Sequence, residues 1–144
     1  MKALSVNATT ILRHLMTGAI DGLPAIREPG NARKLDRNPA YMYLCVEMIA
    51  PGYVSLAHYG LQNGDMIRDP DVVFWDAPGL GWLPVSYRND YAGFDATYVE
   101  AGSEMGLPLV VRDAQGQRGL AEFCETWLVN IVEQQNIEFP KQEV

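Results

Sequence analysis

The sequence has 144 residues, which is enough for one domain with a buried core, and we expect residues 1–144 to form a single domain. Hydrophobic residues make up 48 % of the chain and charged residues 20 %, which is typical of a globular protein and excludes a disordered or fibrous chain. No apolar run approaches the roughly 20 residues of a membrane span. The first residues also lack the apolar core of a signal peptide, so we expect a cytoplasmic protein with no membrane contact.

Charge is unevenly distributed along the chain. The net charge is -7, yet residues 1–40 hold six basic and three acidic groups, whereas residues 41–144 hold five basic and fifteen acidic groups. Binding to nucleic-acid phosphates needs Lys and Arg, so the acidic body argues against direct nucleic-acid binding. Two interpretations of the acidic charge remain: it keeps the protein in solution, or it attracts a basic partner protein.

The first 40 residues predict a helix followed by a loop. Residues 7–17 place Ile11, Leu12, Leu15 and Met16 at helical spacing, and Gly18 ends the pattern. Residues 18–40 contain three Pro and three Gly without any period, which predicts a loop with a short helical turn at residues 32–35.

Two strands follow, at residues 40–49 and 53–61, joined by a turn at residues 50–52. Met42, Leu44, Val46 and Met48 alternate with more polar residues and should face the core. Pairing across the turn also places His58 on the core face, as a packed histidine rather than a catalyst, and Cys45 should be a small buried hydrophobe. The predicted pairs are Glu47 with Ser55, Cys45 with Ala57, Tyr43 with Tyr59, Met48 with Val54, Val46 with Leu56 and Leu44 with His58.

Asn63-Gly64 predicts a second hairpin, because a type I′ turn needs a positive φ at both central residues. Pro70 has no N–H for a ladder, so its strand should lie at an edge or carry a bulge there. Residues 72–75 then resume a buried strand, and residues 76–81 form a loop. The predicted pairs are Gln62 with Asp65, Leu61 with Met66, Tyr59 with Arg68 and His58 with Asp69.

The C-terminal part predicts further strands and one long helix. Residues 82–100 form one or two strands broken near residues 88–93, and residues 107–112 form a short strand before a turn at 113–116. Residues 118–135 carry one apolar stripe that includes Phe123, Cys124 and Trp127, all expected to be buried. The tail after Asn136 should fray.

These elements predict an α+β fold. It consists of an antiparallel β-meander of about four to six strands, with the N-terminal and C-terminal helices packed on one face of the sheet.

No catalytic, metal or cofactor site is predicted. Asp65, Asp69 and Asp71 form an acidic cluster, but a calcium loop would need a closing Glu and differently placed ligands. The two Cys and two His do not have the spacing of zinc ligands. No Ser lies in a nucleophile elbow, and neither Cys has an evident His partner.

The stretch "HYGLQNGDMIRDPDVVFW", followed by "WLPVSYRNDYAGF", resembles a family described only as a domain of unknown function and found on plasmids, integrative elements and phages. The resemblance covers about residues 41–98, and Asp71 departs from the commoner Glu. It implies a mobile-element setting and no particular activity. The matching residues are His58, Tyr59, Gln62, Asn63, Gly64, Asp65, Asp69, Pro70, Asp71, Phe74, Asn89, Asp90, Tyr91 and Gly93.

Two hypotheses about function follow. In the first, the protein is not an enzyme and binds a basic host protein, inhibiting a defence or nucleic-acid-binding factor. Its candidate surface comprises Asp65, Arg68, Asp69, Asp71, Asp76, Asp90 and Asp95. In the second, it is an enzyme or a small-ligand-binding module that uses a sheet face bearing Tyr43, Glu47, Tyr59, Arg68 and Asp90.

Overall fold

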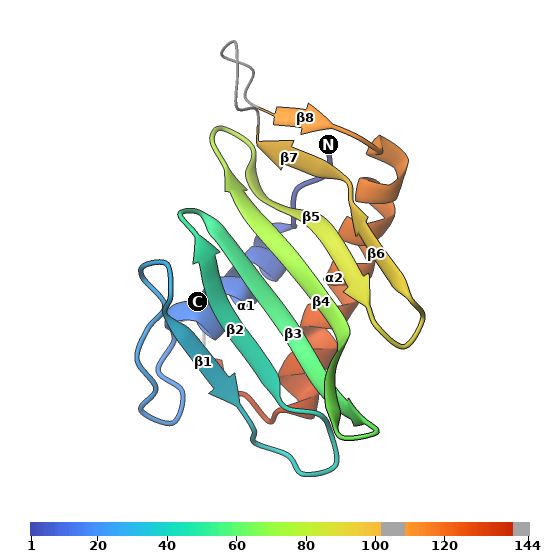
Figure 1. Ribbon diagram of the computed structural model, residues 1–144. Coiled ribbons are helices and arrows are strands. Elements are labelled where there is room, and N and C mark those ends of the chain that lie inside the picture. The colour runs from blue at the N-terminus through green and yellow to red at the C-terminus, as the bar shows by residue number, and fades with distance from the viewer. Residues whose placement is uncertain (102–108, 140–144) are drawn as a thin grey trace.

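The computed structural model describes residues 1–101 and 109–139. Alternating apolar residues build a six-stranded antiparallel sheet with the strand order β1-β2-β3-β4-β5-β6 (Figure 1). Two helices cover one face, and a two-stranded sheet, β7-β8, lies at one end. The predicted α+β meander is therefore confirmed. The elements are α1 (Val6–Thr17), β1 (Ala32–Leu35), β2 (Leu44–Ala50), β3 (Tyr53–Gln62), β4 (Asp65–Ala77), β5 (Gly81–Asn89), β6 (Phe94–Thr97), β7 (Val99–Ala101), β8 (Leu109–Val111) and α2 (Ala114–Gln134).

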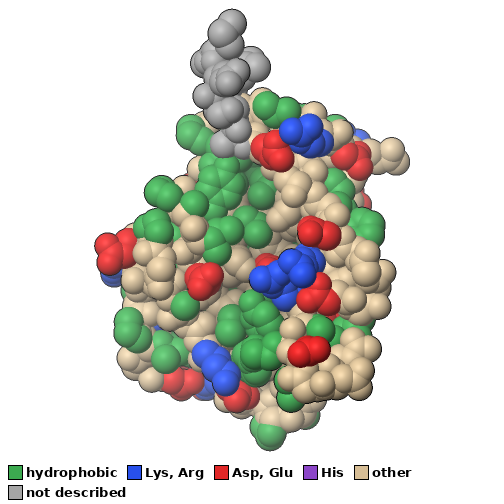
Figure 2. Space-filling view, in the orientation of Figure 1, with side chains coloured by type: hydrophobic (Ala, Val, Ile, Leu, Met, Phe, Trp, Pro, Cys, Tyr) green, Lys and Arg blue, Asp and Glu red, His purple; other side chains and the backbone are tan. Residues whose placement is uncertain are grey.

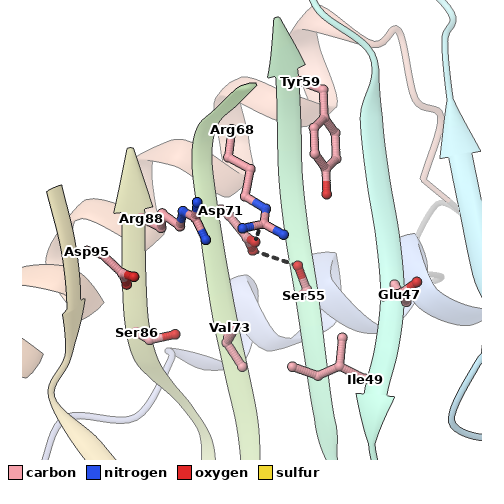
Figure 3. Close-up of a pocket in the computed structure, with 10 residues that line it drawn as sticks. All are labelled: Glu47, Ile49, Ser55, Tyr59, Arg68, Asp71, Val73, Ser86, Arg88 and Asp95. Atoms are coloured by element: carbon pink, nitrogen blue, oxygen red, sulfur yellow. Dashed lines mark hydrogen bonds and ion pairs between the residues drawn. The ribbon is translucent and has the colours of Figure 1, made fainter. Parts of the chain in front are cut away.

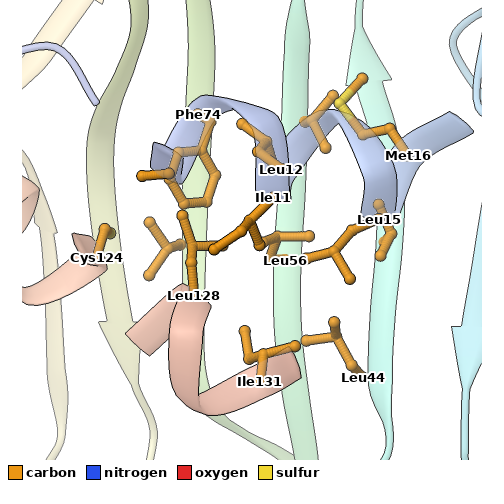
Figure 4. Packing of buried hydrophobic residues seen from close by; sticks show 14 of the residues in the cluster. Ile11, Leu12, Leu15, Met16, Leu44, Leu56, Phe74, Cys124, Leu128 and Ile131 are labelled. Atoms are coloured by element: carbon orange, nitrogen blue, oxygen red, sulfur yellow. The ribbon is translucent and has the colours of Figure 1, made fainter. Parts of the chain in front are cut away.

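The main core lies between the sheet and the two helices (Figure 4). Apolar residues of α1 and α2 meet the apolar row of the central strands, because each helix presents one apolar stripe to one apolar sheet face. Its fully buried members include Leu12, Leu15, Leu44, Leu56, Phe74, Leu128 and Ile131.

A second, smaller core lies on the opposite face of the same sheet. Trp75 and Leu83 are cross-strand partners on β4 and β5, and their neighbours along each strand, Phe74 and Trp82, belong to the main core. Successive strand residues point to opposite faces, so the two clusters lie on the two sides of the sheet. Val99 of β7 is part of this second core, so the small sheet covers one end of the face that the helices leave open.

Most of the predicted register is confirmed. Five of the six pairs between β2 and β3 occur, and Tyr43 and Tyr59 stack with ring centroids 6.2 Å apart although Tyr43 lies just outside the ladder. The Asn63-Gly64 turn has the expected positive φ values of 53° and 85°. The predicted pairing of His58 with Asp69 is wrong, because a bulge shifts the register between Ala57 and Tyr59.

Pro70 lies at that bulge, which confirms one of the two predicted alternatives. The other alternative, an edge strand, does not apply, because β4 is a central strand. The Asp69-Pro70 peptide bond is cis. The interruption lets a central strand carry a residue without an N–H donor.

Several predicted boundaries are wrong. Residues 32–35 form strand β1 rather than a helical turn, because they pair with β2. The first hairpin strand begins at Leu44, since the Met42 carbonyl turns away to accept a hydrogen bond from the Gln135 side chain, and Met42 is exposed. The loop at residues 76–81 is shorter than predicted, because β4 continues to Ala77.

The C-terminal helix also differs from its prediction. It begins at Ala114, because the Asp113 side chain accepts a hydrogen bond from the Gly116 N–H and caps the helix where a turn was expected. Trp127 is buried as predicted, but Phe123 is 41 % exposed, because it lines an open groove between α2 and strands β5 and β6. The tail does not fray at once: Ile137 is buried and Phe139 packs on His14.

Of the remaining predictions, β8 falls within the predicted strand at residues 107–112, whose first two residues lie outside the described chain. Cys124 is buried as predicted, whereas Cys45 is only half-buried, because the sheet face on which it lies is not covered by helices. His58 is buried and its Nδ1 donates to the Tyr43 carbonyl at 3.2 Å.

Candidate functional site

The sheet face turned away from the helices carries a shallow polar depression of about 260 Å³ (Figure 3). It lies beside the second core, over strands β2 to β6. We call this side of the sheet the open face, and we describe its depression by the residues that line it. These are Glu47, Ile49, Ser55, Tyr59, Arg68, Asp71, Val73, Ser86, Arg88 and Asp95.

The register explains why these residues meet. Asp71 on β4 lies opposite Arg88 on β5, and Arg88 lies opposite Asp95 on β6, so acidic and basic side chains alternate across three strands. On the other side, Tyr59 of β3 lies opposite Arg68 of β4. Cross-strand partners project to the same face, so the ladder brings the charges together.

Asp71 is the most enclosed acid of the depression. Its carboxylate accepts a hydrogen bond from the Ser55 hydroxyl at 2.6 Å and lies 3.4 Å from the Arg68 guanidinium. Burial nevertheless raises the pKa of Asp71 above its ordinary value, and Ser55 and Arg68 oppose that rise. Its contacts hold it in the strand, so Asp71 belongs to the floor of the depression.

Asp90 holds Arg68 and Arg88, two residues that line the depression, in place. Its carboxylate accepts the Arg68 backbone N–H at 2.7 Å and the Arg88 Nε–H at 2.8 Å. These two hydrogen bonds, that of Arg68 first, lower the pKa of Asp90 below its ordinary value. Asp69 is held nearby, where it accepts a hydrogen bond from Asn89 at 2.9 Å. Both acids therefore tie the β4 bulge to the β5–β6 turn and do not line the depression.

Stacked aromatic rings lie on this face with the charges. Tyr43 and Tyr59 stack, and the Lys34 ammonium lies 4.2 Å from the centre of the Tyr43 ring. Tyr53 and Trp75 stack at 5.7 Å. Figure 2 shows Lys and Arg side chains in the middle of this side of the molecule, with Asp and Glu beside them and hydrophobic side chains around them.

The structure brings together part of each candidate set. Arg68, Asp71 and Asp95 of the proposed interaction surface line the depression with Glu47 and Tyr59 of the proposed ligand face. Asp65 and Asp76 lie elsewhere, at the hairpin turn and near the far end of β4. Asp69, Asp71 and Asp90 are held by hydrogen bonds, so the acids of this region do not form one uncompensated acidic surface.

Sequence reasoning placed Ser55 beside Glu47 through their predicted pairing, but it missed Ser86 and Arg88 as neighbours of this site. The pairing of Asp71 with Arg88 would have revealed both residues. However, bulges at residues 57–59 and 73–74 shift the strand register on both sides of β4, so counting residues from the turns does not predict that pairing.

The described side chains offer limited chemistry. Within residues 1–101 and 109–139, no group of three or more His, Cys, Asp or Glu residues could hold a metal ion. Burial raises the pKa of both thiols, Cys45 and Cys124, so neither is activated as a nucleophile. The open face is a surface of paired charges and aromatic rings, which suits recognition.

Fold and site together define an α+β protein with one helix-covered and one partly open sheet face. The chain belongs to a family described as a domain of unknown function, DUF6908, whose model matches residues 20–137. The match includes β1 to β8 and α2, and with them the whole depression. Comparisons with curated proteins and with solved structures gave no match. Neither described helix combines the length and apolar character needed to cross a membrane.

Proposed function

We propose that the protein is a non-enzymatic binding protein whose open face engages a basic region of another protein. The observation that carries this proposal is the shallow, solvent-exposed depression, which is lined by three carboxylates, two guanidinium groups and a tyrosine. A surface of this shape suits the side chains of a protein partner better than it encloses a small molecule, because small-molecule sites are mostly concave and apolar.

The exposed acids indicate that the partner carries a positively charged surface. Arg68 and Arg88 are occupied by Asp71 and Asp90, whereas Glu47 and Asp95 are exposed at the margins of the depression. The chain as a whole carries a net charge of -7. Such a field attracts a basic surface, and the attraction weakens as salt screens it.

The resemblance noted in the sequence supports a setting for this binding. Members of the resembled family are found on plasmids, integrative elements and phages. In that setting, a small acidic protein can bind and inhibit a basic host factor, such as a defence or nucleic-acid-binding protein.

The test compares two variants with equal charge. Glu47→Lys with Asp95→Lys reverses the margins of the depression, and Glu28→Lys with Glu133→Lys reverses exposed acids outside it. Each pair of substitutions changes the net charge by four, from -7 to -3. Tagged forms of both variants and of the unmodified protein are used for affinity purification from a bacterial lysate, and the affinity of each captured protein is then measured at low and high salt.

A basic protein that binds the unmodified chain and the control, but binds the open-face variant at least roughly tenfold more weakly, supports the proposal. Equal weakening by both variants would assign the effect to net charge alone. Equal affinity of all three proteins would show that the open face does not contribute to binding.

A second candidate is small-ligand binding in the depression, favoured by the clustered guanidinium groups of Arg68 and Arg88. Arg88→Ala would then abolish binding of a small anionic ligand while leaving capture of a basic protein intact. Binding of an organic anion that depends on Arg88 would place this candidate first.

A further inference from the structure

In the part of the chain that the structure describes, strand β6 has one edge without a neighbouring strand. It is the last strand of the six-stranded sheet, and within the described residues no strand pairs with its outer side (Figure 1). The Tyr98 N–H donates to the Val85 carbonyl at 2.7 Å, and pairs with and without hydrogen bonds alternate along an antiparallel ladder. Asp95 and Thr97 therefore direct their backbone N–H and C=O groups outward, away from β5.

An aromatic groove of about 340 Å³ runs beside this edge, between β6 and α2. Phe94 is 47 % exposed and Phe123 is 41 % exposed, and each ring lies 5.9 Å from the ring of Tyr87. Exposed aromatic rings next to unpaired backbone groups can bind an added strand, since such strands use main-chain hydrogen bonds for affinity and pockets for alternate side chains.

The two faces of β6 differ in chemistry. Phe94 lies on the helix side with the groove, whereas Asp95 projects to the open face beside the depression. The opposite sheet edge, β1, carries Lys34 on its exposed side instead. An added strand at β6 thus meets apolar side chains on one face and negative charge on the other.

We propose that β6 binds an extended segment of a partner protein as a seventh strand, with apolar residues in the Phe94–Phe123 groove and alternate basic residues facing Asp95. This inference rests on the proposed function, because it supplies the way in which a basic partner is held. Strand residues alternate between faces, so the segment recognised has alternating apolar and basic residues.

The test uses a labelled peptide of about ten residues with alternating valine and lysine, which is longer than a typical strand. Its binding is measured by fluorescence anisotropy. Thr97→Pro removes an outward N–H without touching the bonds to β5, because proline is tolerated at an edge position whose N–H faces solvent. Ala32→Pro is the matched control on β1: the Met48 N–H bonds to the Asn31 carbonyl at 3.1 Å, so the same alternation directs the Ala32 N–H outward.

We expect the unmodified protein and Ala32→Pro to bind the peptide equally, and Thr97→Pro and Phe94→Ser to bind at least roughly tenfold more weakly, with unchanged circular dichroism. A valine–aspartate peptide should not bind. Equal binding by all variants, or no binding of the valine–lysine peptide, overturns the inference. A self-associated form of the unmodified protein that Thr97→Pro disperses would show that a second copy occupies the edge, and that also overturns it.

The two proposals fail separately. A captured partner that depends on Glu47 and Asp95 but is unaffected by Thr97→Pro retains the proposed function and rejects the added strand. Peptide binding that depends on Thr97, without any protein partner sensitive to the acids of the open face, rejects the proposed function instead.

Discussion

Arg33 is a buried cation whose guanidinium group bonds to backbone carbonyls. It is 3 % exposed, and its guanidinium donates to the carbonyls of Leu15, Gly18, Leu23 and Pro24 at 2.6–3.0 Å. Two of these carbonyls lie at the C-terminal end of α1, where a positive charge also meets the negative end of the helix dipole. One side chain thus joins β1, α1 and the loop between them.

Replacing Arg33 should therefore destabilise the protein strongly. Arg33→Ala leaves one buried and three partly buried carbonyls without this donor, and we expect a loss of about 2–4 kcal/mol in the free energy of unfolding, measured by urea denaturation. Arg33→Lys should restore only part of it, because an ammonium group cannot reproduce the planar fork of donors. A full rescue by lysine would show that charge alone matters at this position.

His58 is a buried histidine whose titration should affect stability. Burial lowers its pKa below the ordinary value of 6.5, with the hydrogen bond to the Tyr43 carbonyl opposing the change. As the pH falls below 6.5, unfolded chains bind a proton that the folded protein does not, so the free energy of unfolding decreases until the lower, folded pKa is reached.

We expect the decrease in stability between neutral and mildly acidic pH to be smaller in His58→Asn, whose amide nitrogen can occupy the place of Nδ1. Urea denaturation at several pH values measures both slopes. Because the comparison is between slopes, a general destabilisation of the variant does not affect it. Parallel curves for the two proteins would contradict the assignment.

The β3–β4 hairpin is the element that local sequence specifies most directly. Gly64 has a φ of 85°, and a Cβ added there would meet nothing within 4 Å. The cost of a side chain at this position is therefore backbone strain alone. Gly64→Val should lower the free energy of unfolding by about 1–2 kcal/mol, because a β-branched residue resists positive φ.

Gly64→Asn is the control for that change, since asparagine tolerates the left-handed region better than other residues. Thermal or urea denaturation should rank the unmodified protein first, Gly64→Asn second and Gly64→Val last. If valine and asparagine had equal effects, the turn would not be limited by φ.

The whole molecule has two cores that share strands. Phe74 belongs to the main core and its neighbour Trp75 to the second, so neither core can lose β4 without disturbing the other. We therefore expect unfolding in one cooperative step.

A variant with Trp82→Phe and Trp127→Phe retains Trp75 as its only tryptophan and so reports on the second core. Its fluorescence and its far-ultraviolet circular dichroism, which follows the helices over the main core, should give coincident urea transitions. A fluorescence transition at lower urea would show that the second core opens by itself.

Local sequence by itself determined the fold class, the two hairpins and the long helix. Periods of two and of about 3.6 residues depend only on neighbours along the chain, so they place Leu44, Val46 and Leu56 on one sheet face and Trp127 on a buried helix stripe. The Asn63-Gly64 turn then fixes the register near it, as the observed pairs of Tyr59 with Arg68 and Leu61 with Met66 confirm.

Tertiary structure decided the rest, because the deciding contacts join residues far apart in the chain. Residues 32–35 are a strand only because β2 is beside them, and Arg33 is buried only because four carbonyls from residues 15–24 surround it. Phe123 continues an apolar stripe yet stays exposed, because it lines the open groove beside β5 and β6 and not the closed core. The depression depends on two bulges that bring Asp71, Arg88 and Asp95 into line, and the local period of a strand does not reveal a bulge.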